Sequence, residues 1–94
     1  MRRKSLTIGI CAYNEDQNIG HLLDTIGQQQ LPRNVRLLEI LVVASGCTDS
    51  TVPIVREAAK RDPRIRLFTE RKRKGKVTAV NKILRQARGT IIIL

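Results

Sequence analysis

Residues 37–51 read LLEILVVASGCTDST. The first seven are apolar except Glu39, which is typical of a parallel β-strand covered on both faces. A glycine and polar residues follow directly, and Thr48 and Asp49 suit the start of a helix. This strand, turn and helix predict an α/β fold, in which ligands bind outside the carboxyl ends of the strands.

The rest of the chain alternates in the same way. Besides 37–43, apolar runs predict strands over 5–11 and 90–94, and the alternation of 64–69 predicts a half-exposed edge strand. Apolar residues at helical spacing predict helices over 17–29, 49–61 and 76–88. We expect Asn14 or Asp16 to cap the first helix and Gly89 to end the last. The order βαβαβαβ predicts one domain over residues 1–94, built on a parallel sheet with right-handed crossovers.

The last predicted strand carries four consecutive apolar residues, 91–94. Such a run belongs inside a sheet. We therefore expect the chain to be part of a larger protein. We also expect it to self-associate through this strand, because apolar surface and an unpaired sheet edge attract further chains.

A second strand-to-helix turn lies at ICAYNE, residues 10–15. Tyr13 at a strand end can stack on a flat ring, and N–H groups of the helix start can bind phosphate. The alternative is a tyrosine packed on the sheet beside an ordinary helix start. The second turn, 44–49, has the alternative of simple capping. Since both turns follow strands of one sheet, they can form a single crevice.

A third turn contains Gly75 and Lys76, with Asn81 further along the predicted helix. Lys76 near a helix N-terminus can bind phosphate, although the sequence is not a P-loop. The basic run 71–74 before it has two interpretations, a solvated loop or an extension of the anion site.

Composition narrows the function classes. The net charge of +10 favours polyanionic partners, or else a solvated basic surface. Two cysteines, Cys11 and Cys47, make no disulfide framework and indicate the cytosol. They can lie close together, but two small buried residues are the simpler interpretation. With His21 as the one histidine, their spacing predicts no metal site.

Taken in order, these blocks resemble the family 2 glycosyltransferases. The family opening, apolar-Pro-Ala-Tyr-Asn-Glu, corresponds to 10–15; Val-Asp-Asp-Gly-Ser-Thr-Asp-x-Thr corresponds to 43–51; and Gly-Lys-x3-Leu-Asn corresponds to 75–81. Ala-x-Gly-x and a hydrophobic strand follow at 87–94, and the family's Asp-x-Asp would come next. The resemblance covers essentially all 94 residues.

The resemblance implies a Rossmann-like, three-layer α/β/α domain of the GT-A type, truncated here, with parallel strand order 3-2-1-4. It implies a nucleoside diphosphate sugar, UDP- or GDP-linked, as the donor for transfer to an acceptor hydroxyl. Tyr13 would lie against the base, flanked by Ala12 and Glu15, with Lys76 and Asn81 as lesser candidates. Mg²⁺ or Mn²⁺ would be held by Asp-x-Asp. No catalytic or metal-binding residue is expected in this chain, which should be inactive alone.

Two departures from the family pattern matter. Ala44 and Ser45 replace both acidic residues of the second block, so Ser45 would contact the nucleoside through its hydroxyl instead. Cys11 replaces a proline, which we interpret as a packing change. Two alternative functions stay open: a polyanion-binding module without specific nucleic-acid recognition, and a non-catalytic remnant that binds nucleotide or a partner. We expect a cytoplasmic protein, and its basic face would suit the cytoplasmic side of a membrane.

Overall fold

The computed structural model describes residues 3–94. Four strands alternate with three helices, in the predicted order, with these bounds: β1 Lys4–Ala12, α1 Ile19–Gly27, β2 Val35–Ser45, α2 Thr51–Arg61, β3 Ile65–Glu70, α3 Lys76–Gln86 and β4 Ile91–Ile93. The sheet is parallel, with strand order β3-β2-β1-β4. The predicted fold class and strand order 3-2-1-4 are confirmed.

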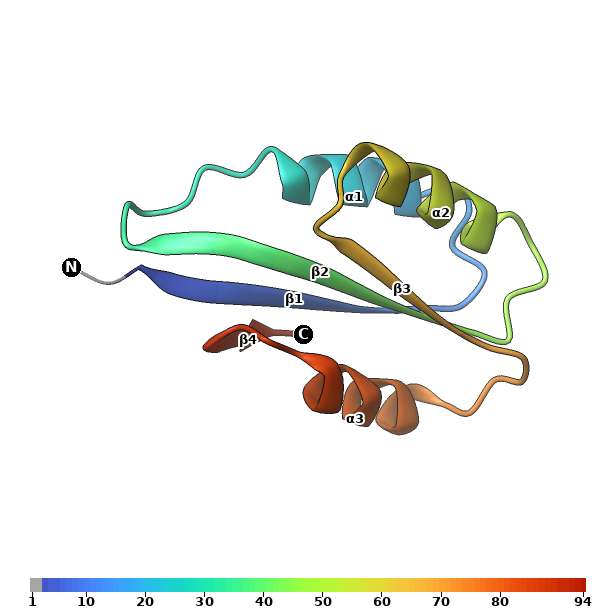
Figure 1. The fold of residues 1–94 in the computed structure, drawn as a ribbon. Helices are drawn as coiled ribbons and strands as arrows, with labels where there is room; N and C mark the ends of the chain where they lie inside the picture. The colour runs from blue at the N-terminus through green and yellow to red at the C-terminus, as the bar shows by residue number, and fades with distance from the viewer. Residues whose placement is uncertain (1–2) are drawn as a thin grey trace.

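The sheet is the middle of three layers. Helices α1 and α2 cover one face and α3 covers the other (Figure 1). Alternate side chains of β2 feed the two cores: Ile40 and Val42 pack toward α1 and α2, whereas Leu41 and Val43 pack toward α3. All four are fully buried. This two-sided burial explains why the run reads as almost continuously apolar.

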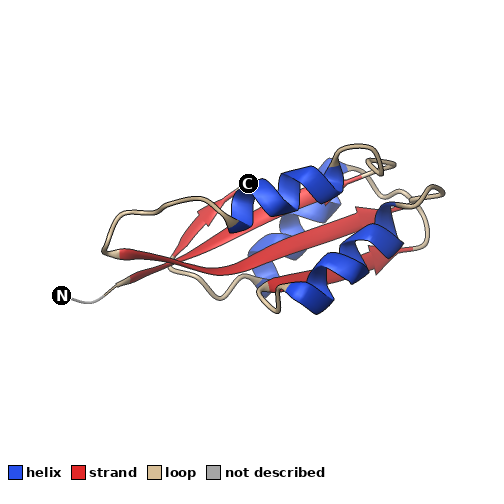
Figure 2. Cartoon of the chain, turned by 90° about the horizontal axis from the view of Figure 1, so that it is seen from above, coloured by secondary structure: helices blue, strands red, loops and turns tan. Residues whose placement is uncertain are grey.

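All three right-handed crossovers place the turns after β1, β2 and β3 at one end of the sheet, away from the N-terminus (Figure 1). Figure 2 shows the same arrangement from above, with the helices running alongside the strands. The carboxyl ends of the strands therefore lie at the same end of the sheet, as the predicted crevice between the turns requires.

The ends of α1 and α2 differ from the prediction. These helices begin at Ile19 and Thr51, two residues later than expected in each case. The predicted capping of α1 by Asn14 or Asp16 is wrong, because the residue before the helix is Asn18 and it makes no side-chain cap. Asn14 and Asp16 are used in the preceding turn instead.

The prediction that Gly89 ends α3 is also wrong. The helix ends at Gln86, and the next residue, Ala87, has extended backbone. A glycine is needed at position 89 for a different reason. The Gly89 N–H donates to Thr7 Oγ1 at 3.0 Å, and a Cβ on residue 89 would lie 2.6 Å from the same oxygen. The glycine lets the chain pass close over β1 before β4 begins.

The last strand is less buried than its sequence predicts. β4 pairs with β1 at the sheet edge, and Ile92, Ile93 and Leu94 are 38%, 52% and 60% exposed. Among the described residues, no helix has the length and apolar character needed to cross a membrane.

Candidate nucleotide-binding site

The turns after β1 and β2 are joined by hydrogen bonds. Asn14 has a left-handed backbone, with φ of 50°, and its side-chain oxygen accepts from the N–H groups of Thr48 at 2.9 Å and Asp49 at 3.3 Å. In return, the N–H of Glu15 donates to Thr51 Oγ1 at 2.8 Å. The two turns therefore form one polar unit at the carboxyl edge of the sheet.

The third turn, residues 71–75, is held against the end of β2. Ser45 Oγ donates to the Lys72 carbonyl at 3.3 Å and accepts from the Lys74 N–H at 3.1 Å. Gly46, with φ of 65°, lies against the backbone of this turn, since a Cβ at Gly46 would be 2.6 Å from the backbone nitrogen of Arg73. Ser45 and Gly46, at the end of β2, thus fix the path of residues 71–75, called the basic loop below.

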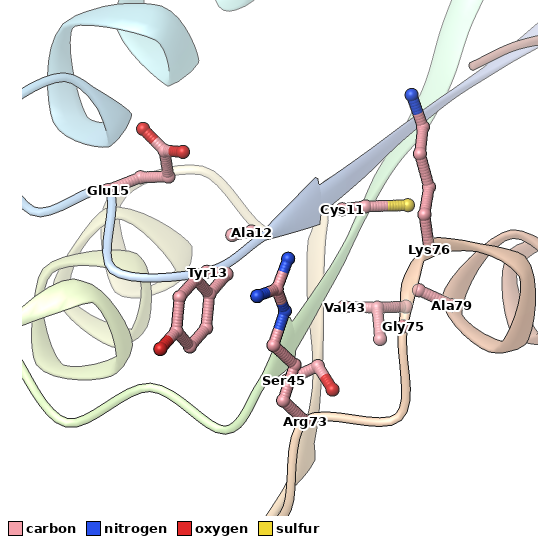
Figure 3. Close-up of a pocket in the computed structure, with 10 residues that line it drawn as sticks. All are labelled: Cys11, Ala12, Tyr13, Glu15, Val43, Ser45, Arg73, Gly75, Lys76 and Ala79. Carbon is pink, nitrogen blue, oxygen red and sulfur yellow. The ribbon is translucent and has the colours of Figure 1, made fainter.

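A pocket of about 260 Å³ opens between the turns after β1 and β3, over the end of β2 (Figure 3). It is lined by ten residues: Cys11, Ala12, Tyr13, Glu15, Val43, Ser45, Arg73, Gly75, Lys76 and Ala79. Five of the six residues singled out from the sequence are among them. Asn81 is not, because it is exposed further along α3.

Tyr13 is 42% exposed, so it is not the packed core tyrosine of the alternative interpretation. The guanidinium carbon of Arg73 lies over its ring, 4.2 Å from the ring centre, as Figure 3 shows. At this distance the cation and the ring attract each other. The pocket therefore presents an aromatic face and a guanidinium together.

Sequence reasoning did not identify Arg73 as a site residue. The run 71–74 reads equally well as a solvated loop, and nothing in its composition distinguishes Arg73 from its neighbours. Its place two residues before Gly75, at the third turn, was the available signal.

The charges around the pocket are mostly positive. Arg73 and Lys76 are its cationic residues, and Glu15 is the one carboxylate in the lining. Burial raises the pKa of the Cys11 thiol above its usual value, and the Lys76 charge only partly offsets this. Cys11 is therefore protonated at neutral pH and behaves as an apolar wall of the pocket.

The side chains around the pocket do not form a metal-binding site. Within residues 3–94, no group of three or more histidine, cysteine, aspartate or glutamate side chains could hold one. Cys11 and Cys47 are both free thiols, and Cys47 Sγ lies 3.7 Å from the Ala12 carbonyl oxygen.

Comparison with known proteins gives consistent results. Residues 7–94 match the family described as glycosyl transferase family 2. The chain is 47% identical over 53 residues to a 4,4'-diaponeurosporenoate glycosyltransferase of Staphylococcus aureus strain bovine RF122 / ET3-1, and 45% identical over 53 residues to that of strain USA300. Each match covers 56% of this chain and 13% of the relative.

A solved structure is similar over nearly the whole chain. This is the mannosyltransferase PcManGT of Pyrobaculum calidifontis, in complex with GDP-Man and Mn²⁺. The TM-score is 0.83 and the identity 37%, over 98% of this chain and 27% of that one. The chain thus spans about an eighth to a quarter of the length of these proteins.

Proposed function

This chain belongs to glycosyl transferase family 2, and we propose that its pocket binds the nucleotide part of a nucleoside diphosphate sugar. In the whole enzyme, the sugar would pass from that donor to an acceptor hydroxyl. The observation that carries the proposal is one pocket at the carboxyl end of a parallel sheet, lined by the turns after β1 and β3 and by the last residues of β2. The complex of the mannosyltransferase neighbour with GDP-Man supports a nucleotide sugar as the ligand.

The lining residues suit the parts of such a donor. Tyr13 is half exposed, and a base can stack on its ring in place of the Arg73 guanidinium that now lies over it. Ala12 is small and flanks the base at the strand end. Lys76 is the first residue of α3, whose start has no side-chain cap, so its charge and free N–H groups can receive phosphate.

Two further residues have different parts in the proposal. Glu15 offers a carboxylate that can accept from a base or ribose. Ser45 holds the 71–75 loop, because its hydroxyl already bonds to Lys72 and Lys74. Asn81 is given no contact with the nucleotide, since it lies outside the pocket.

Transfer itself needs groups that these residues do not provide. The described residues offer no metal-ligand set, and Glu15 is the one carboxylate at the pocket. The Mn²⁺ of the neighbour supports a divalent cation, Mg²⁺ or Mn²⁺, in the whole enzyme, where it would stabilise the leaving diphosphate. We propose that residues 1–94 alone bind the donor without transferring its sugar.

The test is isothermal titration calorimetry of the folded chain with GDP-mannose and with UDP-glucose. Free mannose and free glucose are the respective controls. Circular dichroism first establishes that the chain is folded. We expect the nucleotide sugars to bind and the free sugars not to. A chain that bound single-stranded nucleic acid with a steep salt dependence, and no nucleotide sugar, would instead be a polyanion-binding module.

Location remains a separate proposal. Two free thiols suit a reducing compartment, and the net charge of +10 suits the anionic cytoplasmic face of a membrane. Fractionation of cells expressing the protein would test both parts, because a periplasmic or extracellular product contradicts them.

A further inference from the structure

The basic loop presents its cations to two different places. Arg73 lines the nucleotide pocket, as Figure 3 shows. The other cations of the loop line a separate groove of about 750 Å³, which we call the basic groove. Its lining consists of Thr69, Glu70, Arg71, Lys72, Lys74 and Lys82. Since Lys82 belongs to α3, this groove lies between the end of β3, the basic loop and α3.

The basic groove contains a buried carboxylate. Glu70 is the last residue of β3, and its side chain is 7% exposed. One carboxylate oxygen, Oε2, lies 3.6 Å from Lys74 Nζ. The other, Oε1, is buried and has no hydrogen-bond partner within residues 3–94. Leaving a buried carboxylate oxygen without a donor is unfavourable. The groove therefore holds an acceptor that lacks its donor.

The cations around this carboxylate are in excess. Among residues 3–94, Lys74 is the one of the four that forms an ion pair, whereas Arg71, Lys72 and Lys82 form none. Lys82 Nζ lies 5.5 Å from the centre of the Phe68 ring instead. Like charges gathered at one place repel each other and attract an anion. The groove thus combines a surplus of positive charge with one unsatisfied acceptor.

We propose that the basic groove is a second ligand site, which binds a phosphate ester that also carries a hydroxyl group. The ammonium and guanidinium groups would hold the phosphate through charge-assisted hydrogen bonds. The hydroxyl of the same ligand would donate to Glu70 Oε1. Glycerol phosphate has this chemistry, either free or as the headgroup of phosphatidylglycerol. The site is separate from the nucleotide pocket, so the inference does not depend on nucleotide binding.

Simpler ligands satisfy only part of this groove. A bare anion would meet the cations, but it would be repelled by the Glu70 carboxylate and would leave Oε1 without a donor. A DNA strand supplies phosphates and no sugar hydroxyls along its length. The other interpretation of the run 71–74, a solvated basic loop, gives no reason for a buried carboxylate beneath it. A hydroxylated phosphate ester accounts for both features.

The first test compares two esters that differ in their hydroxyls. Isothermal titration calorimetry of the folded chain is carried out with glycerol 3-phosphate and with propyl phosphate, which has the same carbon chain without hydroxyls. We expect glycerol 3-phosphate to bind about tenfold more tightly, the gain typical of one hydrogen bond to a charged group.

Variants of Glu70 separate hydrogen bonding from simple charge balance. Glu70→Leu removes the acceptor, so the preference for glycerol 3-phosphate should disappear while propyl phosphate binds at least as tightly as to the wild type. If Glu70→Leu does not fold, as judged by circular dichroism, the isosteric Glu70→Gln is used. It keeps a neutral acceptor, whose hydrogen bond is about half as strong, so the preference should fall to about threefold.

Lysine variants locate the phosphate. Lys82→Gln removes a cation of the groove and should weaken both esters about tenfold. The matched control is Lys60→Gln, which removes an exposed cation on α2 and should leave both affinities unchanged. Binding that is lost in Lys76→Gln but kept in Lys82→Gln would place the phosphate in the nucleotide pocket and overturn the proposal.

Vesicles distinguish the two sources of the ligand. Co-sedimentation compares phosphatidylglycerol with phosphatidylethanol, an anionic lipid whose headgroup has no hydroxyl, in vesicles of equal charge. Preference for phosphatidylglycerol supports the site with a lipid as its ligand, and preference among the soluble esters alone supports it with a soluble ligand. Equal binding within both pairs, tighter binding of single-stranded DNA than of either ester, or no binding at all overturns it. None of these results affects nucleotide binding in the other pocket.

Discussion

Thr7 Oγ1 donates a 2.8 Å hydrogen bond to Glu39 Oε2 across the two central strands, at paired positions of β1 and β2. The same carboxylate oxygen accepts from the Arg88 N–H at 2.6 Å, and Oε1 accepts from Arg66 Nη1 at 2.7 Å. Glu39 is 3% exposed. A buried carboxylate is tolerated only when its oxygens are fully bonded, and here they tie the junction of α3 and β4 to three strands.

Removing this carboxylate should destabilise the fold strongly. Glu39→Ala leaves the Arg66 charge and the Arg88 N–H without their partner, and we expect a loss of about 3 kcal/mol in the free energy of unfolding. The control is Glu57→Ala, which removes an exposed ion pair with Lys60 and should cost about 0.5 kcal/mol or less. Urea unfolding measures both, and equal losses would contradict the central position given to Glu39.

The same cluster predicts an acid sensitivity. Burial alone would raise the pKa of Glu39, but hydrogen bonds from the Arg88 N–H, Arg66 and Thr7 outweigh burial and hold that pKa below its usual 4.5. A carboxyl whose pKa is lower in the folded state contributes stability above its unfolded pKa, and this is lost as pH falls through the folded pKa.

The difference in unfolding free energy between wild type and Glu39→Gln should therefore be largest near neutral pH and shrink below pH 4.5. Urea unfolding of both proteins at a series of pH values checks this. A difference that stays constant down to pH 3, below the range in which a glutamate ordinarily titrates, would show that the carboxylate charge is not what stabilises the junction.

Gly46 and Gly75 give a matched pair for the basic loop. Both have positive φ, 65° and 88°, so alanine at either position costs about 1–3 kcal/mol of backbone strain, and Gly75, with ψ of 166°, lies in a region that is essentially restricted to glycine. Only at Gly46 would the new Cβ also meet the backbone of Arg73, whereas at Gly75 it meets nothing within 4 Å. Gly46→Ala should therefore add a steric clash to the backbone strain, and it should move Arg73 away from Tyr13.

Intrinsic fluorescence can report that movement, because Tyr13 is the one tyrosine and the chain has no tryptophan. We expect the emission to change in Gly46→Ala and to stay close to wild type in Gly75→Ala. The reverse pattern would show that Gly46 does not position the loop.

Tyr13 allows the stacking part of the proposed function to be tested directly. Tyr13→Ala should weaken nucleoside diphosphate binding by about 10–100-fold, since base stacking on an aromatic ring is worth about 1–3 kcal/mol. Tyr13→Phe keeps the ring and should bind within about twofold of wild type, because stacking does not need the hydroxyl. Unchanged affinity in Tyr13→Ala, measured by titration calorimetry, would remove Tyr13 from the site.

The features that the sequence predicts well are those carried by local pattern. Alternating strands and helices identify the parallel sheet, and strand ends followed by polar turns locate the pocket, because both follow from residues adjacent in the chain. Tyr13 was identified in this way from its place at a strand end, whereas Ala12 and Glu15 were added by the family resemblance.

The features that the sequence did not predict depend on pairing across the fold. Glu39 reads only as an interruption of an apolar run, because its partners Thr7, Arg66 and Arg88 are 27 to 49 residues away. From the sequence, Asn14 was expected to cap the helix that follows it. Its actual contact with Thr48 joins two turns and cannot be predicted from neighbouring residues. Such contacts exist only once strand order and register are set.

The edge strand β4 leads to the last prediction, self-association of the 94-residue chain. Ile92, Ile93 and Leu94 are exposed along an unpaired edge of the described sheet, which is a template for pairing with another chain. Ile93→Lys places a charge on that edge and should lower the apparent mass in sedimentation velocity. Leu22→Lys alters an exposed leucine on α1, away from β4, and should not. A wild-type chain that sediments as a monodisperse monomer at high concentration would contradict edge pairing, since both variants would then have nothing to disrupt.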